Sequence, residues 1–305
     1  MDNKQIELIN RIQELKKAKN AVILAHNYQP SEIQDIADFV GDSLELSQKA
    51  ASTAADVIVF CGVHFMAETA SILSPDKTVL LPDSAAGCPM ADMVTAEELI
   101  KAKKELPDAA VVTYVNSTAA VKAESDICCT SANASKVVAG LSEEEILFVP
   151  DQYLGQYVAS QVPNKKYTFW PGYCPVHADI KAEDVLKLKQ EYPEAKVVVH
   201  PECRPEVTAL ADEVLSTGGM CRYAAHPEVR QMIVVTEIGI IHRMQKENPQ
   251  KLFIPISQNA VCRNMKLITV EKVLRSLETL TPEVKVPEDI RLRAVGAVNR
   301  MLAAV

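Results

Sequence analysis

Three cysteines recur in register within a threefold sequence repeat. Each copy begins with a short apolar segment that ends in a polar residue suited to chemistry; these residues are His26, Tyr114 and His200. A cysteine follows that residue by 62, 60 and 62 positions, and the three are Cys88, Cys174 and Cys262. The repeat predicts three similar modules that each bring one thiol to a common centre. Three cysteine ligands at one point favour a metal cluster whose fourth position stays open, as a catalytic site requires.

A hydroxyl residue also recurs, 17 positions after each of the three polar residues. The hydroxyl residues are Ser43, Ser131 and Thr217. Each is predicted where a loop turns into a helix, and there a hydroxyl and the free N–H groups of the first turn can bind an anion without arginine. The alternative is that each hydroxyl merely caps its helix.

The other five cysteines occupy unmatched positions in the repeat. They are Cys61, Cys128, Cys129, Cys203 and Cys221. For these, burial as small apolar side chains is the favoured interpretation. No two cysteines are spaced as CxxC, so neither a zinc ribbon nor a ferredoxin-type site is indicated. A cluster held by the matched cysteines would have to be assembled by the fold.

The repeat predicts the elements that position these residues. Helical periodicity covers residues 4–17, 95–106 and 181–192, and residues 269–280 form a fourth copy that we expect to close back onto the first module. Nine apolar runs indicate strands: 21–26, 57–60, 78–81, 110–114, 146–149, 167–170, 196–200, 232–235 and 252–255. Short Val/Ile-rich runs between helices are typical of buried parallel strands, whose carboxyl ends share one edge of each sheet.

An α/β fold of three homologous αβα modules with short parallel sheets follows from this pattern. We predict a first module of residues 1–87 with 268–305, a second of residues 88–173 and a third of residues 174–267. Ligands bind outside the carboxyl ends of such strands, where the three polar residues and the cysteine loops are expected.

Composition narrows the function classes. The chain has 305 residues, 48% of them hydrophobic and 24% charged, with a net charge of −8 and no dense Lys/Arg block, so nucleic-acid binding is not indicated. The amino-terminal residues predict an amphipathic polar helix and not a signal sequence. No apolar run approaches the roughly 18 residues of a membrane span. Eight cysteines without an export signal favour a reducing compartment, and we expect the cytoplasm.

Ten segments in order resemble the quinolinate synthase family, and the resemblance covers essentially the whole chain. They are AHNYQ (25–29), GDSLELS (41–47), FCGVHFMAETA (60–70), LLPDSAAGCPMADM (80–93), YVNSTAAVKAESDICCTSANA (114–134), FVPDQYLGQYVA (148–159), WPGYCPVH (170–177), HPEC (200–203), STGGM (216–220) and QNAVCRNMK (258–266).

The resemblance implies a [4Fe–4S] cluster on Cys88, Cys174 and Cys262, and three αβα modules around a pseudo-threefold axis. It also implies a transferase of de novo NAD biosynthesis. The substrates would be iminosuccinate, supplied by an aspartate-oxidising enzyme, and dihydroxyacetone phosphate. The products would be quinolinate, phosphate and water, with the cluster acting as a Lewis acid.

Specific roles follow for residues beside the strand ends. Glu202 lies two positions after His200 and is the first candidate for general base, while Tyr28, two after His26, is a candidate acid. His26 and His200 would hydrogen-bond substrate carboxylate or carbonyl groups, and His200 is also a catalytic candidate. The remaining predicted substrate contacts, beside Glu202, are Ser43, Tyr114, Asn116, Ser131, His177 and Thr217.

Two other functions remain open from the sequence. A non-catalytic iron–sulfur protein would explain the three cysteines but not the polar residues predicted around them. A metal-independent aldolase would need a Schiff-base lysine near the site, and Lys122 and Lys266 are the candidates.

Overall fold

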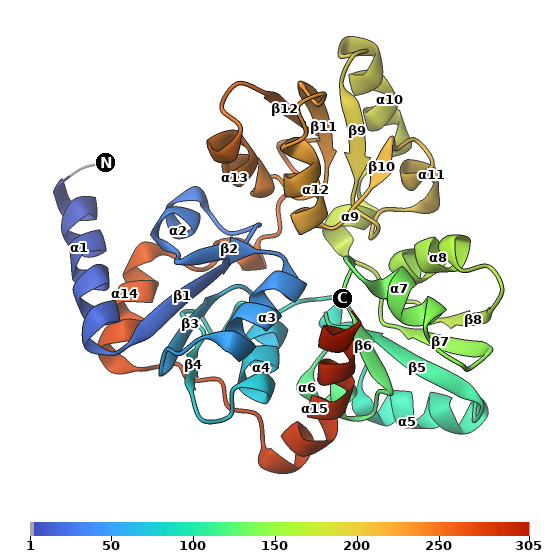
Figure 1. The fold of residues 1–305 in the computed structure, drawn as a ribbon, viewed down its shortest axis with the longest axis horizontal. Coiled ribbons are helices and arrows are strands. Elements are labelled where there is room, and N and C mark those ends of the chain that lie inside the picture. The colour runs from blue at the N-terminus through green and yellow to red at the C-terminus, as the bar shows by residue number, and fades with distance from the viewer. Residues whose placement is uncertain (1–2, 305) are drawn as a thin grey trace.

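The computed structural model describes residues 3–304 as three α/β units, each built on a four-stranded sheet. Figure 1 shows the three sheets in three lobes around a central region. All strand pairs within the three sheets are parallel. The predicted α/β class with three αβα modules is therefore confirmed, while the pseudo-threefold axis stays a prediction.

The first unit has strand order β2-β1-β3-β4. Its elements are α1 (Asn3–Ala18), β1 (Ala21–His26), α2 (Ser31–Ile36), β2 (Phe39–Gly41), α3 (Ser43–Ser52), β3 (Val57–Cys61), α4 (His64–Leu73), β4 (Thr78–Leu80) and the short 3-10 turn η1 (Ala91–Met93). β3 is buried along its whole length and β1 is buried apart from its first residue, which explains their unbroken apolar sequences.

The second and third units repeat this order as β6-β5-β7-β8 and β10-β9-β11-β12. The second contains α5 (Ala96–Glu105), β5 (Ala109–Tyr114), α6 (Ala119–Ala123), β6 (Ile127–Cys129), α7 (Ala134–Ala139), β7 (Glu145–Val149), α8 (Gln152–Gln161), β8 (Lys166–Phe169) and the short helix α9 (Pro175–Ala178). The third contains α10 (Ala182–Glu191), β9 (Lys196–Val199), α11 (Pro205–Thr208), β10 (Glu213–Val214), α12 (Thr217–Ala224), β11 (Gln231–Val235), α13 (Ile240–Glu247), β12 (Leu252–Pro255) and the 3-10 turn η2 (Asn264–Lys266).

The shared strand order explains why the polar residues meet. In each sheet the chain reverses its direction of winding beside the first strand, which is β1, β5 or β9. A crevice forms outside the carboxyl end of a strand at such a switch point. His26 and Tyr114 are the last residues of β1 and β5, and His200 directly follows β9.

A repeated side-chain contact supports the common origin of the three units. The carboxylates of Asp38, Asp126 and Asp212 accept backbone N–H bonds from residues 23, 111 and 197 at 2.8, 2.8 and 2.7 Å. Each contact fastens the segment before the second strand to the first strand of its sheet. The same device at the same register occurs in all three units.

All nine predicted strands and all four predicted helices are present, with ends within two residues of those expected. The sequence analysis missed β2, β6 and β10, the second strand of each sheet. These strands have only three, three and two residues, which is too short for a recognisable apolar run.

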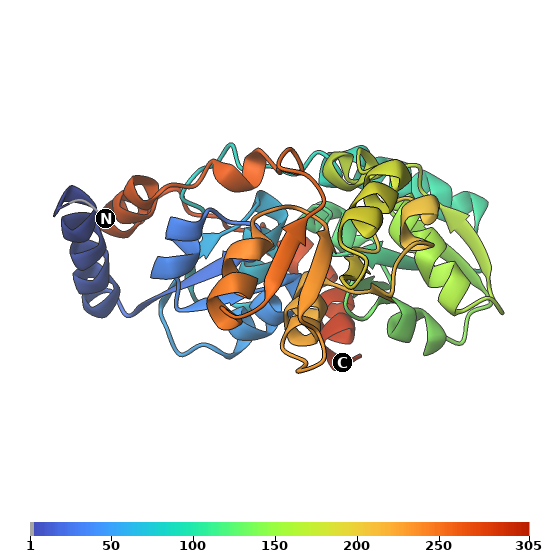
Figure 2. The same cartoon turned by 90° about the horizontal axis from the view of Figure 1, so that it is seen from above.

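Two helices follow the third unit and return to the others. α14 (Val270–Thr279) packs against α1, and Figures 1 and 2 both place the pair at one end of the flattened molecule. α15 (Glu288–Ala303) packs against α6 and β6 of the second unit and against α4 of the first. The boundaries at residues 87/88, 173/174 and 267/268 stay predictions.

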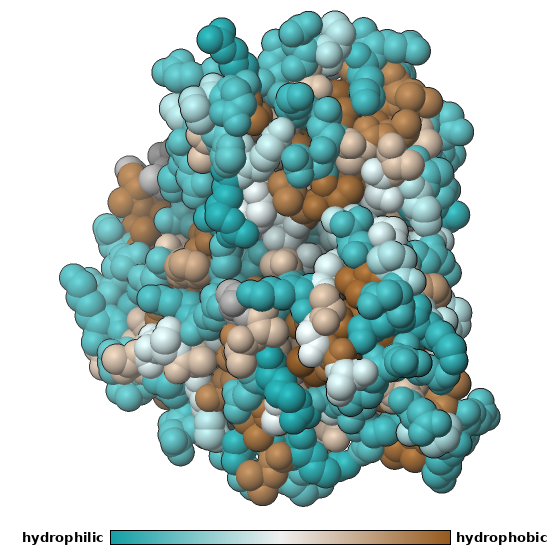
Figure 3. Space-filling model, turned by 45° about the vertical axis from the view of Figure 1, so that its right-hand side comes forward, coloured by the Kyte–Doolittle hydropathy of each residue, from teal (hydrophilic) through white to brown (hydrophobic). Residues whose placement is uncertain are grey.

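The surface is mixed in polarity. On the face shown in Figure 3, hydrophobic patches lie among larger hydrophilic areas. Within residues 3–304, no helix combines the length and the apolarity that crossing a membrane requires.

Candidate active site

One central cavity is lined by residues from all three units. Every one of the thirteen residues that the sequence predicted for the site lies in this lining. They are His26, Tyr28, Ser43, Cys88, Tyr114, Asn116, Ser131, Cys174, His177, His200, Glu202, Thr217 and Cys262. Their convergence is a property of the fold, whereas their individual roles stay predictions.

The three matched cysteines differ from the other five in exposure. Cys88, Cys174 and Cys262 are half-buried and line both the central cavity and a second hollow next to it. The five unmatched cysteines are buried, and among residues 3–304 no disulfide is formed. The matched thiols therefore stand between two spaces, and the others are packed as apolar side chains.

Backbone N–H groups surround the three matched sulfur atoms. Burial raises the pKa of Cys88 to about 12, although hydrogen bonds from the backbone N–H groups of Ala91 and Met90 act in the opposite direction and lower it. Burial likewise raises the pKa of Cys174, while a hydrogen bond from the backbone N–H of His177 lowers it. The pKa of Cys262 is also raised by burial and opposed by two backbone bonds, from residues 264 and 265. In each case the donors lie two or three positions after the cysteine, at the start of η1, α9 or η2.

This donor set fits an iron–sulfur cluster. Cluster iron is bound by cysteine thiolates, and hydrogen bonds to sulfur tune such centres. Burial disfavours the free thiolates, so a bound metal would have to displace the thiol protons and supply the compensating charge. Three thiols from three separate units supply three of the four ligands that such a cluster takes. The structure thus favours a metal cofactor at this point.

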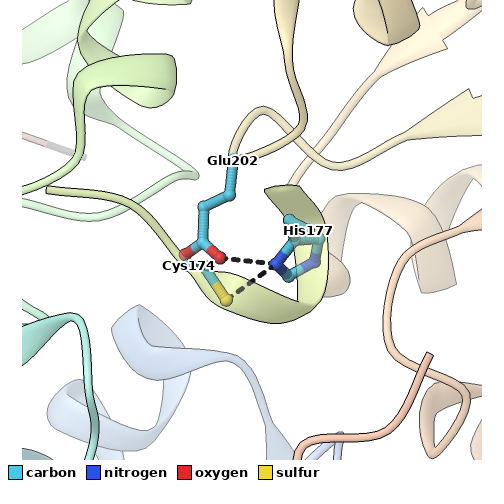
Figure 4. A group of neighbouring side chains, drawn as sticks. All are labelled: Cys174, His177 and Glu202. Atoms are coloured by element: carbon cyan, nitrogen blue, oxygen red, sulfur yellow. Dashed lines mark hydrogen bonds and ion pairs between the residues drawn. The ribbon is translucent and has the colours of Figure 1, made fainter. Parts of the chain in front are cut away.

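A second group of possible metal ligands shares one of these cysteines. Cys174, His177 and Glu202 place one ligand atom each within 4.8 Å of one another (Figure 4). The Nδ1 atom of His177 lies 2.7 Å from Glu202 Oε2 and 3.2 Å from the Cys174 sulfur. These three groups already contact one another, and we interpret His177 as the link between the cysteine and the carboxylate.

His26 and His200 have the same local geometry. The Nδ1 atom of each accepts the backbone N–H of the residue two positions later, Tyr28 at 3.1 Å and Glu202 at 3.4 Å. Burial lowers the pKa of both imidazoles to about 3, so both are neutral at neutral pH. A neutral ring whose Nδ1 accepts carries its proton on Nε2. Both residues can therefore offer an N–H donor to a ligand oxygen.

Glu202 is the centre of the polar lining. Its Oε1 accepts the phenolic hydroxyl of Tyr114 at 2.5 Å, and its Oε2 contacts His177. Burial alone would raise its pKa, but His177 and the hydrogen bond from Tyr114 together hold the pKa below its usual range. Glu202 is therefore ionised at neutral pH, as a proton acceptor must be.

Thr236 joins the two ends of this network, and the sequence analysis missed it. Its hydroxyl lies 2.8 Å from His177 Nε2 and 2.5 Å from the Tyr28 hydroxyl. If the His177 ring is neutral with its proton on Nδ1, facing Glu202, then Nε2 accepts from Thr236, whose oxygen must accept from Tyr28. Burial raises the pKa of Tyr28 well above its usual value, so its phenol keeps the proton that this chain requires.

The three hydroxyl residues are not helix caps. Asp42 caps α3 and Ser216 caps α12, so Ser43 and Thr217 occupy the next position. Ser131 lies in the turn before α7, whose cap position is Asn133. The capping alternative is therefore wrong for all three. Within the described chain the hydroxyls of Ser43 and Ser131 make no hydrogen bond, and the Oδ1 atom of Asn116 is buried without a partner.

Glu237 lines the cavity and is a second residue that the sequence analysis missed. It is fully buried and accepts three hydrogen bonds. Its Oε1 atom accepts hydrogen bonds from the backbone N–H of Cys262 at 3.0 Å and from Lys266 Nζ at 2.9 Å, while its Oε2 atom accepts from the N–H of Gly239 at 2.6 Å. Lys266 also donates to the carbonyl oxygen of Tyr28. Glu237 thus ties the Cys262 loop to the first unit.

Gly239→Ala should loosen this tie. A Cβ atom at Gly239 would lie 2.7 Å from Lys266 Nζ, 2.8 Å from Glu237 Oε2 and 2.9 Å from the backbone of Tyr28. Because the backbone atom cannot move away easily, we expect a loss of about 1–3 kcal/mol in unfolding free energy and weaker iron retention. Denaturant unfolding and iron analysis would check this, with Gly140→Ala, where a Cβ meets nothing closer than 3.5 Å, as the control. Unchanged iron retention would contradict it.

Neither candidate Schiff-base lysine lines the cavity. Lys122 is fully buried, donates to the carbonyl oxygen of Ser117 and lies 5.4 Å from the centre of the Phe65 ring. Lys266 is engaged by Glu237 and Tyr28. Both amines have structural partners, so the geometry does not favour the aldolase hypothesis.

Comparison with known proteins gives a consistent result. The sequence profile of the family described as quinolinate synthetase A protein matches residues 10–303. The chain is 65% identical over 300 residues to the quinolinate synthase of Dehalococcoides mccartyi strain CBDB1, covering 98% of this chain and 99% of that protein. It is 58% identical over 292 residues to that of Geobacter metallireducens, covering 96% of each. Quinolinate synthase 1 of Methanosarcina acetivorans is 56% identical over 299 residues, or 98% of each chain.

Proposed function

Because the chain belongs to the quinolinate synthetase A family, we propose that it is a quinolinate synthase of NAD biosynthesis. It would condense iminosuccinate with dihydroxyacetone phosphate and release quinolinate, phosphate and water. The observation that carries the proposal is the convergence of three thiols and ten polar residues from three units on one cavity. Cytoplasmic location and supply of iminosuccinate by an aspartate-oxidising enzyme belong to the same proposal.

The three half-buried cysteines would hold a [4Fe–4S] cluster. When bound, such a cluster supplies a Lewis-acid iron with one position free for a substrate oxygen or nitrogen. Each cysteine would come from a different unit, so the cluster site would be complete only when all three units are packed together.

The polar lining suits the charges of these substrates. Iminosuccinate has two carboxylates and dihydroxyacetone phosphate has one phosphate, and all need hydrogen-bond donors. Among residues 3–304 no arginine or lysine lines the cavity. The neutral rings of His26 and His200 would donate through Nε2. The hydroxyls of Ser43, Ser131 and Thr217 would donate from three sides, and two of them stand at the first turn of a helix.

Proton transfers would use the Glu202 network. Glu202 is ionised and lies at the cavity wall, so it would accept a proton from a substrate carbon or nitrogen. Tyr28 keeps its proton and would donate to a leaving oxygen. The contacts from Tyr28 through Thr236 and His177 to Glu202 would return the proton from Glu202 to Tyr28 between steps, once the Thr236 hydroxyl turns towards Tyr28 and the His177 proton moves to Nε2.

The non-catalytic iron–sulfur hypothesis predicts a different outcome from the same protein. Anaerobic purification with iron and sulfide counting, followed by a quinolinate assay on the two substrates, would test the proposal. We expect close to four irons per chain on a [4Fe–4S] basis and quinolinate that depends on both substrates. A loaded cluster without quinolinate, and without a spectral response to substrate, would refute the proposal in favour of a redox or sensing protein.

A further inference from the structure

A buried asparagine connects the outer surface of the molecule to one of the cavity hydroxyls. Asn27 is fully buried, directly after β1. Its Nδ2 atom donates to Thr217 Oγ1 at 2.9 Å, and its Oδ1 atom accepts from Arg243 Nη1 at 2.9 Å. Asn27 belongs to the first unit, while Thr217 and Arg243 belong to the third. The contact therefore crosses between units twice.

Arg243 determines which way the amide of Asn27 faces. A guanidinium group has only donors, so the atom that faces it must be the carbonyl oxygen. The guanidinium is itself held, since Nη1 also donates to the carbonyl oxygen of Val40 at 2.9 Å and Nε donates to Glu247 at 2.8 Å. The amide nitrogen of Asn27 must then face Thr217.

The orientation of the amide in turn determines the role of the Thr217 hydroxyl. A hydroxyl that accepts an amide N–H keeps its own proton for another partner. Among the described residues Thr217 Oγ1 has no other hydrogen bond, it is 3% exposed, and it lines the cavity. Its proton therefore points to the ligand space. Ser43 and Ser131 lack such a contact, so their hydroxyls can rotate.

We propose that Asn27 and Arg243 are positioning residues that hold the Thr217 hydroxyl as a permanent donor to an anionic group of the substrate. The inference rests on the proposed function for the identity of the anion, a carboxylate or a phosphate. The direction of the hydroxyl rests only on the contacts above. Asn27→Asp tests it well, because the carboxylate keeps the size of the amide and its contact with Arg243 but can only accept.

In Asn27→Asp the Thr217 hydroxyl should turn round and donate to residue 27, leaving its lone pairs towards the ligand. We expect binding of inorganic phosphate or quinolinate to the anaerobic holoprotein, measured by calorimetry, to weaken about 10- to 100-fold for whichever probe occupies this position. Melting temperature should change little. Failure of the unaltered protein to bind either anion, or equal affinities in the two proteins, would overturn the inference.

A double-mutant cycle separates this effect from the added charge. If residue 27 acts through the hydroxyl, Asn27→Asp should weaken binding far less in a Thr217→Val background than in the unaltered protein. An equal loss in both backgrounds would show that charge alone is responsible and would overturn the inference.

Arg243→Met gives a second test that leaves Asn27 in place. Without the guanidinium the amide can turn, and we expect binding to weaken about 3- to 10-fold. Arg222→Met is the matched control, because Arg222 bridges the same two units through Glu45 at 2.9 Å without contacting Asn27. Equal affinities in these two variants would contradict the inference. If the variants show the whole expected binding pattern but the unaltered protein forms no quinolinate, the proposed function is refuted while the inference about Thr217 stands.

Discussion

Replacing Cys88, Cys174 or Cys262 by serine is expected to abolish both cluster binding and quinolinate formation. Each of these thiols comes from a different unit and lines the central cavity, so no neighbouring cysteine can take its place. The loss of one thiolate leaves two ligands, too few to retain a cluster against solvent. Iron and sulfide content, the visible spectrum and the quinolinate assay should all fall to background in each variant.

Cys61→Ser is the matched control for these variants. Cys61 is the last residue of β3, is buried and lies outside the cavity lining. We expect its variant to keep a full cluster, with at most a moderate loss of stability from placing a hydroxyl in an apolar site. Circular dichroism would confirm that all four variants are folded. Normal turnover by any cluster-free variant would remove the basis for the proposed chemistry.

The repeat made most of the fold and site predictable. Runs such as residues 21–26 and 57–60 are apolar on both faces because parallel strands are buried on both faces, and the structure places β1 and β3 there. Chemistry then follows from topology. A residue such as His200 that directly follows the first strand of a parallel sheet must lie at the crevice, whatever the details of packing.

The residues that were missed fall into two kinds. Thr236 and Glu237 directly follow the predicted strand at 232–235, so the rule that found His200 would have found them too. Asn27 is different, because its importance depends on Arg243, which is 216 positions away in the sequence. No local pattern reports such a contact, since it exists only after the first and third units have packed together.

Glu202→Gln is expected to remove turnover and leave the cluster in place. Glutamine has nearly the shape of glutamate and can still accept from Tyr114 through its carbonyl oxygen, so the wall of the cavity should persist. It cannot take up a proton, and its NH₂ group, a donor, would face a second donor, the N–H at Nδ1 of His177. We expect kcat to fall about 10²- to 10⁴-fold, with iron content unchanged. Steady-state quinolinate kinetics and iron analysis on the same preparation would measure both.

The comparison of these two losses decides what Glu202 does. The contact between His177 and the Cys174 sulfur gives Glu202 an indirect link to the cysteine, so a purely structural role would lower cluster content and turnover together. Glu45→Gln serves as the control, since the carboxylate of Glu45 also joins two units, by pairing with Arg222 at 2.9 Å, but does not line the cavity. If Glu202 is the base, Glu202→Gln should lose turnover and keep its cluster, whereas Glu45→Gln should keep both. The reason is that only the carboxylate of Glu202 faces the space in which the substrates would lie.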